Sequence, residues 1–139
     1  MASEYGARVF QRRFGKGRDH RAASLRVGFE NARVLHPDAD QVASAELVNE
    51  MPYVVGSNGP EVPYRVRFKT MFMGGWLRFR SLYPTWIVRL FEPQALSFDR
   101  NVNRRYVVAG PEGKLRAYLT HYSFEKGHDA WIKKQTRAC

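Results

Sequence analysis

The stretch from Val62 to Phe72 constrains the fold of this 139-residue chain more than any other part of it. Its side chains alternate with a period of two, which is the period of a β-strand. One face of this strand would carry Val62, Tyr64, Val66 and Phe68, and the other Pro63, Arg65, Arg67 and Lys69. We therefore expect a strand with one apolar side and one basic side.

Short apolar runs predict further strands along the chain. They lie at Ala7–Phe10, Ala32–His36, Trp86–Phe91, Leu96–Phe98 and Leu115–Tyr122. Turns are predicted at Gly56–Pro60 and at Gly110–Gly113, where glycine and proline gather.

Helices are predicted between these strands. Asp19 is placed to cap a helix running to about Phe29. Ser44 is placed to cap a helix through Met51, with Glu46 in its first turn, where the helix dipole favours an acid. A last amphipathic helix is expected from about Lys126. This order of elements predicts a single α/β domain.

The charge of the chain is strongly basic and unevenly spread. The net charge is +10, from 23 basic and 13 acidic residues, yet residues 34–64 contain no Lys or Arg. A basic balance indicates a polyanionic partner such as nucleic acid, an anionic membrane surface or a phosphorylated substrate. An acidic island between two basic stretches favours a cation site with an anion nearby over a plain nucleic-acid binder.

Cysteine and hydropathy exclude several classes of protein. The one cysteine is Cys139, so neither an internal disulfide nor a cysteine-rich zinc site is expected. A reducing, cytoplasmic location fits this usage. No run of 18 apolar residues occurs, and the N-terminus carries Glu4 and Arg8 without an apolar h-region, so we expect neither a membrane span nor a signal peptide.

Two aspartates follow the short strand predicted at Ala32–His36. Asp38 and Asp40 are expected to lie together on the loop that leaves this strand. One carboxylate can hold a sugar hydroxyl while the other binds a hard divalent cation, which in turn neutralises a diphosphate. The alternative is that one of them merely caps the turn into the next helix, and the pattern alone leaves both open.

Six segments in order carry a resemblance to a known family. They are Tyr5–Arg12, Val34–Gln41, Ala45–Met51, Phe72–Arg78, Tyr83–Phe91 and Gly113–Ser123. The series spans the chain and resembles family 2 glycosyltransferases, in which a strand is followed by a D-A-D-E motif and a helix. The resemblance implies a partial GT-A-like α/β sheet with flanking helices that lacks the first βα units. Residues 1–51 would end the nucleotide-binding half, and residues 52–139 would form the acceptor-side half.

The resemblance also implies a function in polysaccharide biosynthesis. The family transfers a sugar from a nucleoside diphosphate sugar to a glycan or lipid-linked acceptor. Asp40 and Asp38 would bind Mg²⁺ or Mn²⁺, which acts as a Lewis acid, and Asp38, Arg89 and His121 would bind the substrate diphosphate. The other interpretations are that Arg89 is an outward strand residue and that His121 is a packing residue.

The sequence departs from the family at several motif positions. The departures are Gln41, Thr85, Ile87, Asn103–Tyr106 and Gln135–Cys139. No carboxylate stands where the family places the base that activates the acceptor, and Glu61 and Asp99 are candidates only by their position in the sequence. Because such a base contributes about 10²–10⁴-fold to the rate, we expect little or no transferase activity from this chain alone.

The aromatic residues between 76 and 89 leave further partners open. Trp76, Phe79, Tyr83 and Trp86 alternate with Arg78, Arg80 and Arg89. This set suits a sugar-stacking or membrane-facing surface, a nucleic-acid platform, or core aromatics beside solvated arginines. The rival functions are a small basic nucleic-acid-binding module and an inactive interaction fragment.

We also expect two kinds of contact outside the chain. One is with the inner face of the bacterial plasma membrane, and the other is self-association through the edge of the strand at Ala7–Phe10.

Overall fold

The structure is a computed structural model that describes residues 2–13, 22–57, 59–60, 62–78, 83–98, 106–108 and 110–122. The chain divides into two compact units, Met1–Glu30 and Asn31–Cys139. The second unit contains the main sheet and all four residues of the candidate site. The division falls after Glu30, whereas the family resemblance divides the chain after Met51.

The first unit has little regular structure among its described residues. A 3₁₀-helix, η1, spans Ala2–Tyr5, and one helical turn covers residues 22–24. The strand predicted at Ala7–Phe10 is wrong, because these residues are exposed and pair with no described strand. Nη2 of Arg8 instead donates a hydrogen bond of 2.6 Å to the carbonyl of Gly28. The expected self-association depended on that strand's edge and loses this support.

The helix predicted to run to about Phe29 is also wrong over its described part. Helical backbone ends at Ser24, and Gly28 has a φ of 69°, which no right-handed helix contains. The apolar spacing of these residues therefore gives way to a glycine turn. Asp19, the predicted cap, lies outside the described residues, as does the helix predicted from Lys126.

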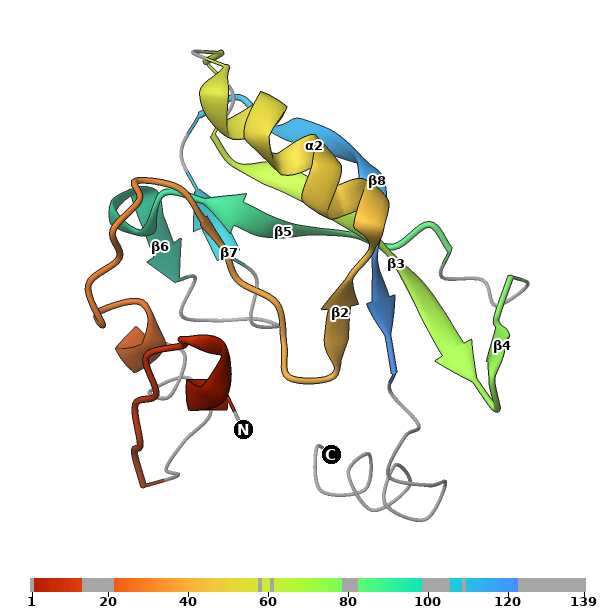
Figure 1. The fold of residues 1–139 in the computed structure, drawn as a ribbon. Helices are drawn as coiled ribbons and strands as arrows, with labels where there is room; N and C mark the ends of the chain where they lie inside the picture. The colour runs from red at the N-terminus through yellow and green to blue at the C-terminus, as the bar shows by residue number, and fades with distance from the viewer. Residues whose placement is uncertain are drawn as a thin grey trace. The chain divides into compact units, whose positions relative to one another are not determined.

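The second unit is built on a mixed sheet of six strands (Figure 1). The order across the sheet is β1 (Val34–Leu35), β5 (Trp86–Phe91), β3 (Tyr64–Phe72), β8 (Gly113–His121) and β2 (Gln41–Ala43). A short strand, β4 (Gly75–Trp76), pairs with the end of β3. Strands β3 and β8 are parallel, and the other pairs are antiparallel. The fold is thus mixed α/β, with a curled sheet and few helices among the described residues.

A separate two-stranded sheet follows β5. It consists of β6 (Leu96–Phe98) and β7 (Tyr106–Val108), and a 3₁₀-helix, η2 (Pro93–Ala95), leads into it. The strand predicted at Leu96–Phe98 is therefore confirmed with its bounds.

The other strand predictions are confirmed with small shifts. Trp86–Phe91 has the predicted bounds, and the alternating stretch forms β3 from Tyr64 onward. The strand predicted at Ala32–His36 is shorter in the structure, where β1 contains only Val34 and Leu35 and the loop that carries Asp38 begins at His36. Strand β8 begins at Gly113, two residues early. Glycine is needed there because a Cβ atom would lie 2.4 Å from the ring of Tyr64.

The helix that covers the sheet is α2 (Ala45–Gly56). The Ser44 side chain caps its first turn, as predicted, by accepting a 3.1 Å hydrogen bond from the backbone N–H of Leu47. The helix continues past Pro52, where a stop was expected, because Met51 and Val54 pack against the core. Among the described residues no helix has the length and apolarity needed to cross a bilayer.

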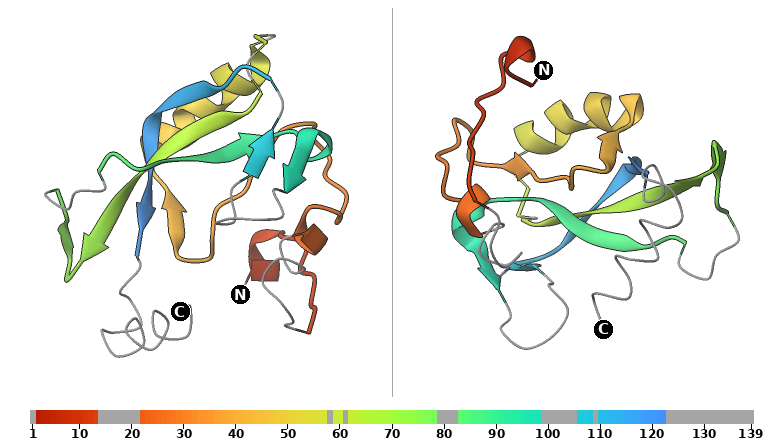
Figure 2. Two further views of the ribbon diagram at one scale, coloured as in Figure 1. Left: turned by 180° about the vertical axis from the view of Figure 1, so that it is seen from behind. Right: turned by 90° about the horizontal axis from the view of Figure 1, so that it is seen from below.

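The core lies between α2 and one face of the sheet. Its fully buried members include Leu47, Val66, Leu90, Leu115 and Leu119. Figure 2 shows that α2 and the segment leading into β2 lie on the same side of the sheet. The apolar side of β3 faces this core, as the alternation predicts, and its basic side belongs to the opposite face.

Removing the cap of α2 should lower stability in a measurable way. We expect Ser44→Ala to reduce the free energy of unfolding by about 1 kcal/mol, because the Leu47 N–H loses its acceptor. Urea unfolding followed by circular dichroism measures this loss. Ser57→Ala is the matched control, since the Ser57 hydroxyl only donates to the carbonyl of Val54 at the exposed end of the helix. Equal losses in both variants would contradict the role given to Ser44.

Candidate functional site

A single loop, His36–Asp40, connects the two outermost strands of the sheet, β1 and β2. Its first residue is fixed to β5 by a 2.8 Å hydrogen bond from the His36 N–H to the Arg89 carbonyl. Its last residue accepts one of 2.8 Å at the Asp40 carbonyl from the N–H of Tyr122, just after β8. Because β3 lies between β5 and β8, the loop passes across the sheet and carries both aspartates with it.

Asp38 is held by a buried arginine of β5. Nη2 of Arg89 donates a hydrogen bond to Oδ2 of Asp38, and the Arg89 side chain is only 5% exposed. The interpretation of Arg89 as an outward strand residue is therefore wrong. A buried guanidinium needs an anionic partner, and Asp38 supplies it while remaining 33% exposed itself.

Gln41 completes the setting of Asp38. Its side chain accepts a 3.0 Å hydrogen bond from the Asp38 N–H and lies 3.4 Å from Oδ2 of Asp38. Its own backbone N–H donates to the Asp38 carbonyl at 3.0 Å. Sequence reasoning missed this residue, which is 8% exposed, and treated it only as a departure from an acidic motif position. The usable signal was a glutamine three residues after an aspartate, the spacing at which a Gln side chain can reach back to a backbone N–H.

Asp40 pairs with His121, the last residue of β8. Nε2 of His121 lies 3.3 Å from Oδ2 of Asp40, and the two side chains are 23% and 34% exposed. The His121 ring also packs against Phe68, with ring centroids 5.2 Å apart. His121 therefore packs on the sheet, as one interpretation held, and also meets Asp40, while its binding of the diphosphate stays a prediction.

These positions permit a test of the metal implied by the resemblance. Carboxylate oxygen is an ordinary donor to Mg²⁺ and Mn²⁺, whereas imidazole nitrogen is a commoner donor to Zn, Cu, Fe and Ni. Neighbouring ligands of an octahedral ion lie about 3 Å apart. The 3.3 Å between Asp40 and His121 fits two such positions. In the described part of the chain no three His, Cys, Asp or Glu side chains form a metal-binding group. The protein would thus supply two donors and leave the other positions to a ligand and water.

Two further carboxylates were candidates from the sequence. Glu61 and Asp99, the two carboxylates considered as a general base, fall outside the described residues. The loop His36–Asp40 therefore brings Asp38 to Arg89 of β5 and Asp40 to His121 of β8. The two carboxylates bind partners on different strands.

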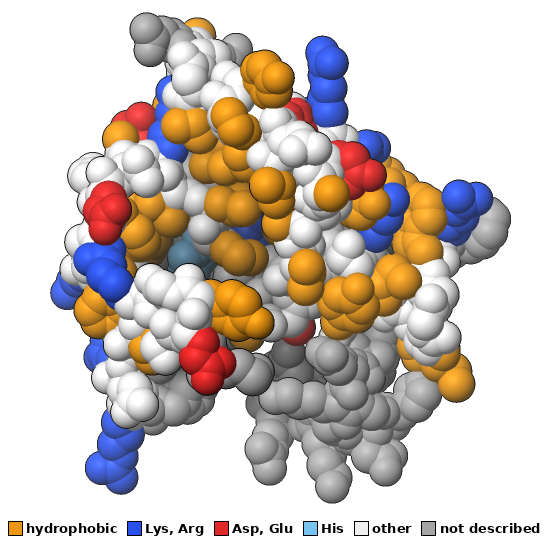
Figure 3. Space-filling model, in the orientation of Figure 1, with side chains coloured by type: hydrophobic (Ala, Val, Ile, Leu, Met, Phe, Trp, Pro, Cys, Tyr) orange, Lys and Arg blue, Asp and Glu red, His pale blue; other side chains and the backbone are white. Residues whose placement is uncertain are grey.

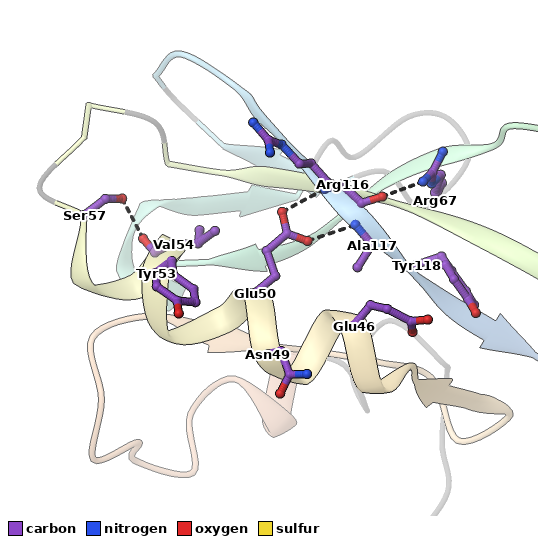
Figure 4. A pocket seen from close by; sticks show the side chains of 10 residues that line it. All are labelled: Glu46, Asn49, Glu50, Tyr53, Val54, Ser57, Arg67, Arg116, Ala117 and Tyr118. Atoms are coloured by element: carbon purple, nitrogen blue, oxygen red, sulfur yellow. Dashed lines mark hydrogen bonds between the residues drawn. The ribbon is translucent and has the colours of Figure 1, made fainter.

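A groove of about 770 Å³ runs between α2 and β8, beside the core (Figure 4). A bulge in β8 shapes it, since two steps along β3 from Arg65 to Arg67 match four along β8 from Lys114 to Tyr118. The bulge turns two adjacent N–H groups, of Arg116 and Ala117, toward the Glu50 carboxylate, which accepts both at 2.8 Å. Sequence reasoning did not find this role of Glu50.

Comparisons of the chain with protein-family models, with curated proteins and with solved structures found no significant match.

Replacing Asp38 should destabilise the fold more than replacing Asp40. We expect Asp38→Asn to lower the free energy of unfolding by about 3 kcal/mol, because the buried Arg89 loses its anion. Asp40→Asn should cost less than about 1 kcal/mol, since its partner His121 is partly exposed. Chemical unfolding of both variants compares the two losses. A loss from Asp38→Asn no larger than that from Asp40→Asn would refute the role of Asp38 as the anionic partner of the buried Arg89.

Glu50 should be needed to close the bulge in β8. In Glu50→Gln an NH₂ group replaces one accepting oxygen, so a strand N–H would face a second donor. We expect a loss of about 1–3 kcal/mol and faster hydrogen exchange at Arg116 and Ala117. Glu46→Gln, on the same helix but fully exposed to solvent, is the control and should leave both amides protected. Unchanged exchange in Glu50→Gln would disprove this role.

Proposed function

We propose that this chain binds a nucleoside diphosphate sugar and is part of a GT-A-like glycosyltransferase related to family 2. The observation that carries the proposal is the loop His36–Asp40. Its two aspartates, residues 38 and 40, meet residues 89 and 121, which are far apart in the sequence, in two polar pairs. The family resemblance selects these same four residues. In this family the product would be a glycan or a lipid-linked saccharide.

Each pair has a distinct part in such a site. Asp40 and His121 would hold Mg²⁺ or Mn²⁺, which supplies a Lewis acid for the charge of the diphosphate. Arg89 fixes the orientation of the Asp38 carboxylate, which would accept a hydroxyl of the ribose or sugar. Gln41 then keeps the loop in the shape that presents both groups. Asp38 thereby acts chiefly on the substrate, and Asp40 on the metal.

A specific observation also favours nucleic acid as an alternative ligand. The basic side of β3 and β8 carries Arg65, Arg67, Lys69, Lys114 and Arg116, which we call the basic face. Two of these, Arg67 and Arg116, also line the groove beside α2. Cations of the basic face lie over aromatic rings: Lys114 Nζ is 5.5 Å from the centroid of Trp86, and Lys69 Nζ is 3.4 Å from that of Tyr118. Basic strands with aromatic residues are typical of single-stranded nucleic-acid binding.

One acidic residue offsets this charge within the described part of the face. The carboxylate of Glu112 accepts hydrogen bonds of 2.5 and 2.8 Å from Arg65, and this bonding lowers the pKa of Glu112. The pair lies at the start of β8, whereas His121 ends it. A neutral substitution of Glu112 therefore changes charge away from the candidate site.

Binding of nucleotide sugars tests the proposal directly. We expect UDP-glucose, GDP-mannose or a related donor to bind in the presence of Mn²⁺ and to lose affinity when EDTA removes the metal. Asp40→Asn and His121→Ala should each weaken this binding by at least about tenfold. Loss of a residue that merely hydrogen-bonds to a metal-binding side chain already has an effect of about this size. Isothermal titration calorimetry measures the affinities, and no turnover is required.

The control is Glu112→Gln, which removes the same charge and should keep the affinity of the parent chain. No Mn²⁺-dependent binding across a panel of nucleotide sugars, or equal binding by Asp40→Asn, would contradict the proposal. Binding of single-stranded oligonucleotides that weakens steeply with salt, and that Asp40→Asn leaves intact, would favour the alternative.

A further inference from the structure

The end of β3 and β4 form a hairpin, residues 69–78, whose tip is apolar. The pairing of Phe72 with Gly75 leaves Met73 and Gly74 as a two-residue loop. Both have positive φ, 47° and 78°, which is the backbone of a type I′ turn. The Met73 side chain is 83% exposed at this tip.

The turn itself gives no reason for a methionine at position 73. Asparagine and glycine are the residues that adopt positive φ most readily, and asparagine would also place a polar group in water. The chain instead puts an unbranched apolar side chain at the tip, next to the half-buried Phe72. A residue that suits neither the backbone nor the solvent points to a contact outside the chain.

A collar of cations lies directly behind this tip. Lys69 Nζ is 4.9 Å and the Arg78 guanidinium 4.6 Å from the centroid of the Trp76 ring. Residues 69–78 contain these two cations and no acid. Tryptophan, lysine and arginine are the side chains that lie at the level of lipid headgroups, with apolar residues deeper. The hairpin thus has an apolar residue at its tip and tryptophan and cations behind it, which matches the acyl chains and the headgroups of a bilayer.

The hairpin is also accessible and lies in a basic setting. Figure 1 shows it extending beyond the neighbouring strands, and Figure 3 shows apolar and basic side chains at that edge. Lys69 belongs both to the collar and to the basic face, which would be attracted to an anionic surface from a distance. We propose that the hairpin docks on an anionic phospholipid bilayer, with Met73 in the headgroup–acyl boundary and Lys69 and Arg78 on lipid phosphates.

One feature favours lipid over nucleic acid as the partner of the hairpin. A nucleic acid offers no apolar phase to receive the exposed Met73 side chain. This proposal does not depend on the proposed function, because it concerns neither Asp40 nor His121.

Vesicle binding by the full chain tests the proposal. We expect the chain to sediment with vesicles of phosphatidylcholine mixed with phosphatidylglycerol, and much less with phosphatidylcholine alone. Met73→Asn suits the turn and should fold at least as well, yet it should weaken the partition by about tenfold, because the apolar tip is lost. Lys69→Gln and Arg78→Gln should each weaken it by about fivefold.

Matched controls separate these effects from general changes in surface. Tyr53→Gln removes an exposed aromatic residue from α2, and Arg13→Gln removes an exposed cation. Both should bind vesicles like the parent chain. In a Cys139→Ser background, a polarity-sensitive label on Met73→Cys should shift to the blue on anionic vesicles, which reports entry of the tip.

Several results would overturn the proposal. These are equal binding to both kinds of vesicle, parental binding by Met73→Asn, or no spectral shift of the label. Displacement of the chain from vesicles by oligonucleotide, with Met73→Asn as effective as the parent, would identify a nucleic-acid surface instead. Loss of self-association in Met73→Asn, without any vesicle binding by the parent, would identify the tip as a contact between copies.

Discussion

The ion pair between Arg89 and Asp38 fixes the connection between the two edges of the sheet, and the geometry of the candidate site depends on it. A buried ion pair adds little stability over apolar side chains of the same volume, but it has a defined geometry. Here it ties the loop His36–Asp40 to β5 before the loop reaches β8. The other end of the loop is held beside His121 by the hydrogen bond from the Tyr122 N–H to the Asp40 carbonyl and by the pairing of Gln41 with His121. The ion pair therefore positions the loop more than it strengthens the core.

The alternation along β3 has a second consequence, because it gives the sheet two unlike faces. Val66 lies fully buried under α2, while Arg65 and Arg67 point to the opposite side. The bulge in β8 keeps the same alternation of side chains between the two faces. It also leaves two backbone N–H groups of β8 without strand partners, and these donate hydrogen bonds to Glu50. One carboxylate of α2 thus joins the helix to the strand that carries His121. The chemistry of each face follows from a period of two.

Local signals predicted the parts of the fold that depend on local physics. The cap at Ser44 and the strand Trp86–Phe91 are confirmed because neither needs knowledge of distant partners. The strand at Ala7–Phe10 failed because apolar residues form a strand only where another strand pairs with them. The same holds for the candidate site. Asp38 and Asp40 were found as a sequence pattern, whereas the burial of Arg89 depends on a contact between distant residues, and Gln41 was missed although its hydrogen bond with Asp38 is local.

The hairpin at residues 69–78 and the candidate site are linked by the pairing of β3 with β8. Thr70 of β3 is the register partner of His121 in β8, and its carbonyl accepts a 3.0 Å hydrogen bond from Leu77, just after β4. The hairpin therefore leaves the sheet beside the strand end that carries the Asp40–His121 pair. A bilayer that received Met73 would hold headgroups close to that pair. An acceptor joined to a lipid could then reach the site without leaving the membrane, whereas a free glycan would gain nothing from the hairpin. The two proposals together thus favour a lipid-linked acceptor.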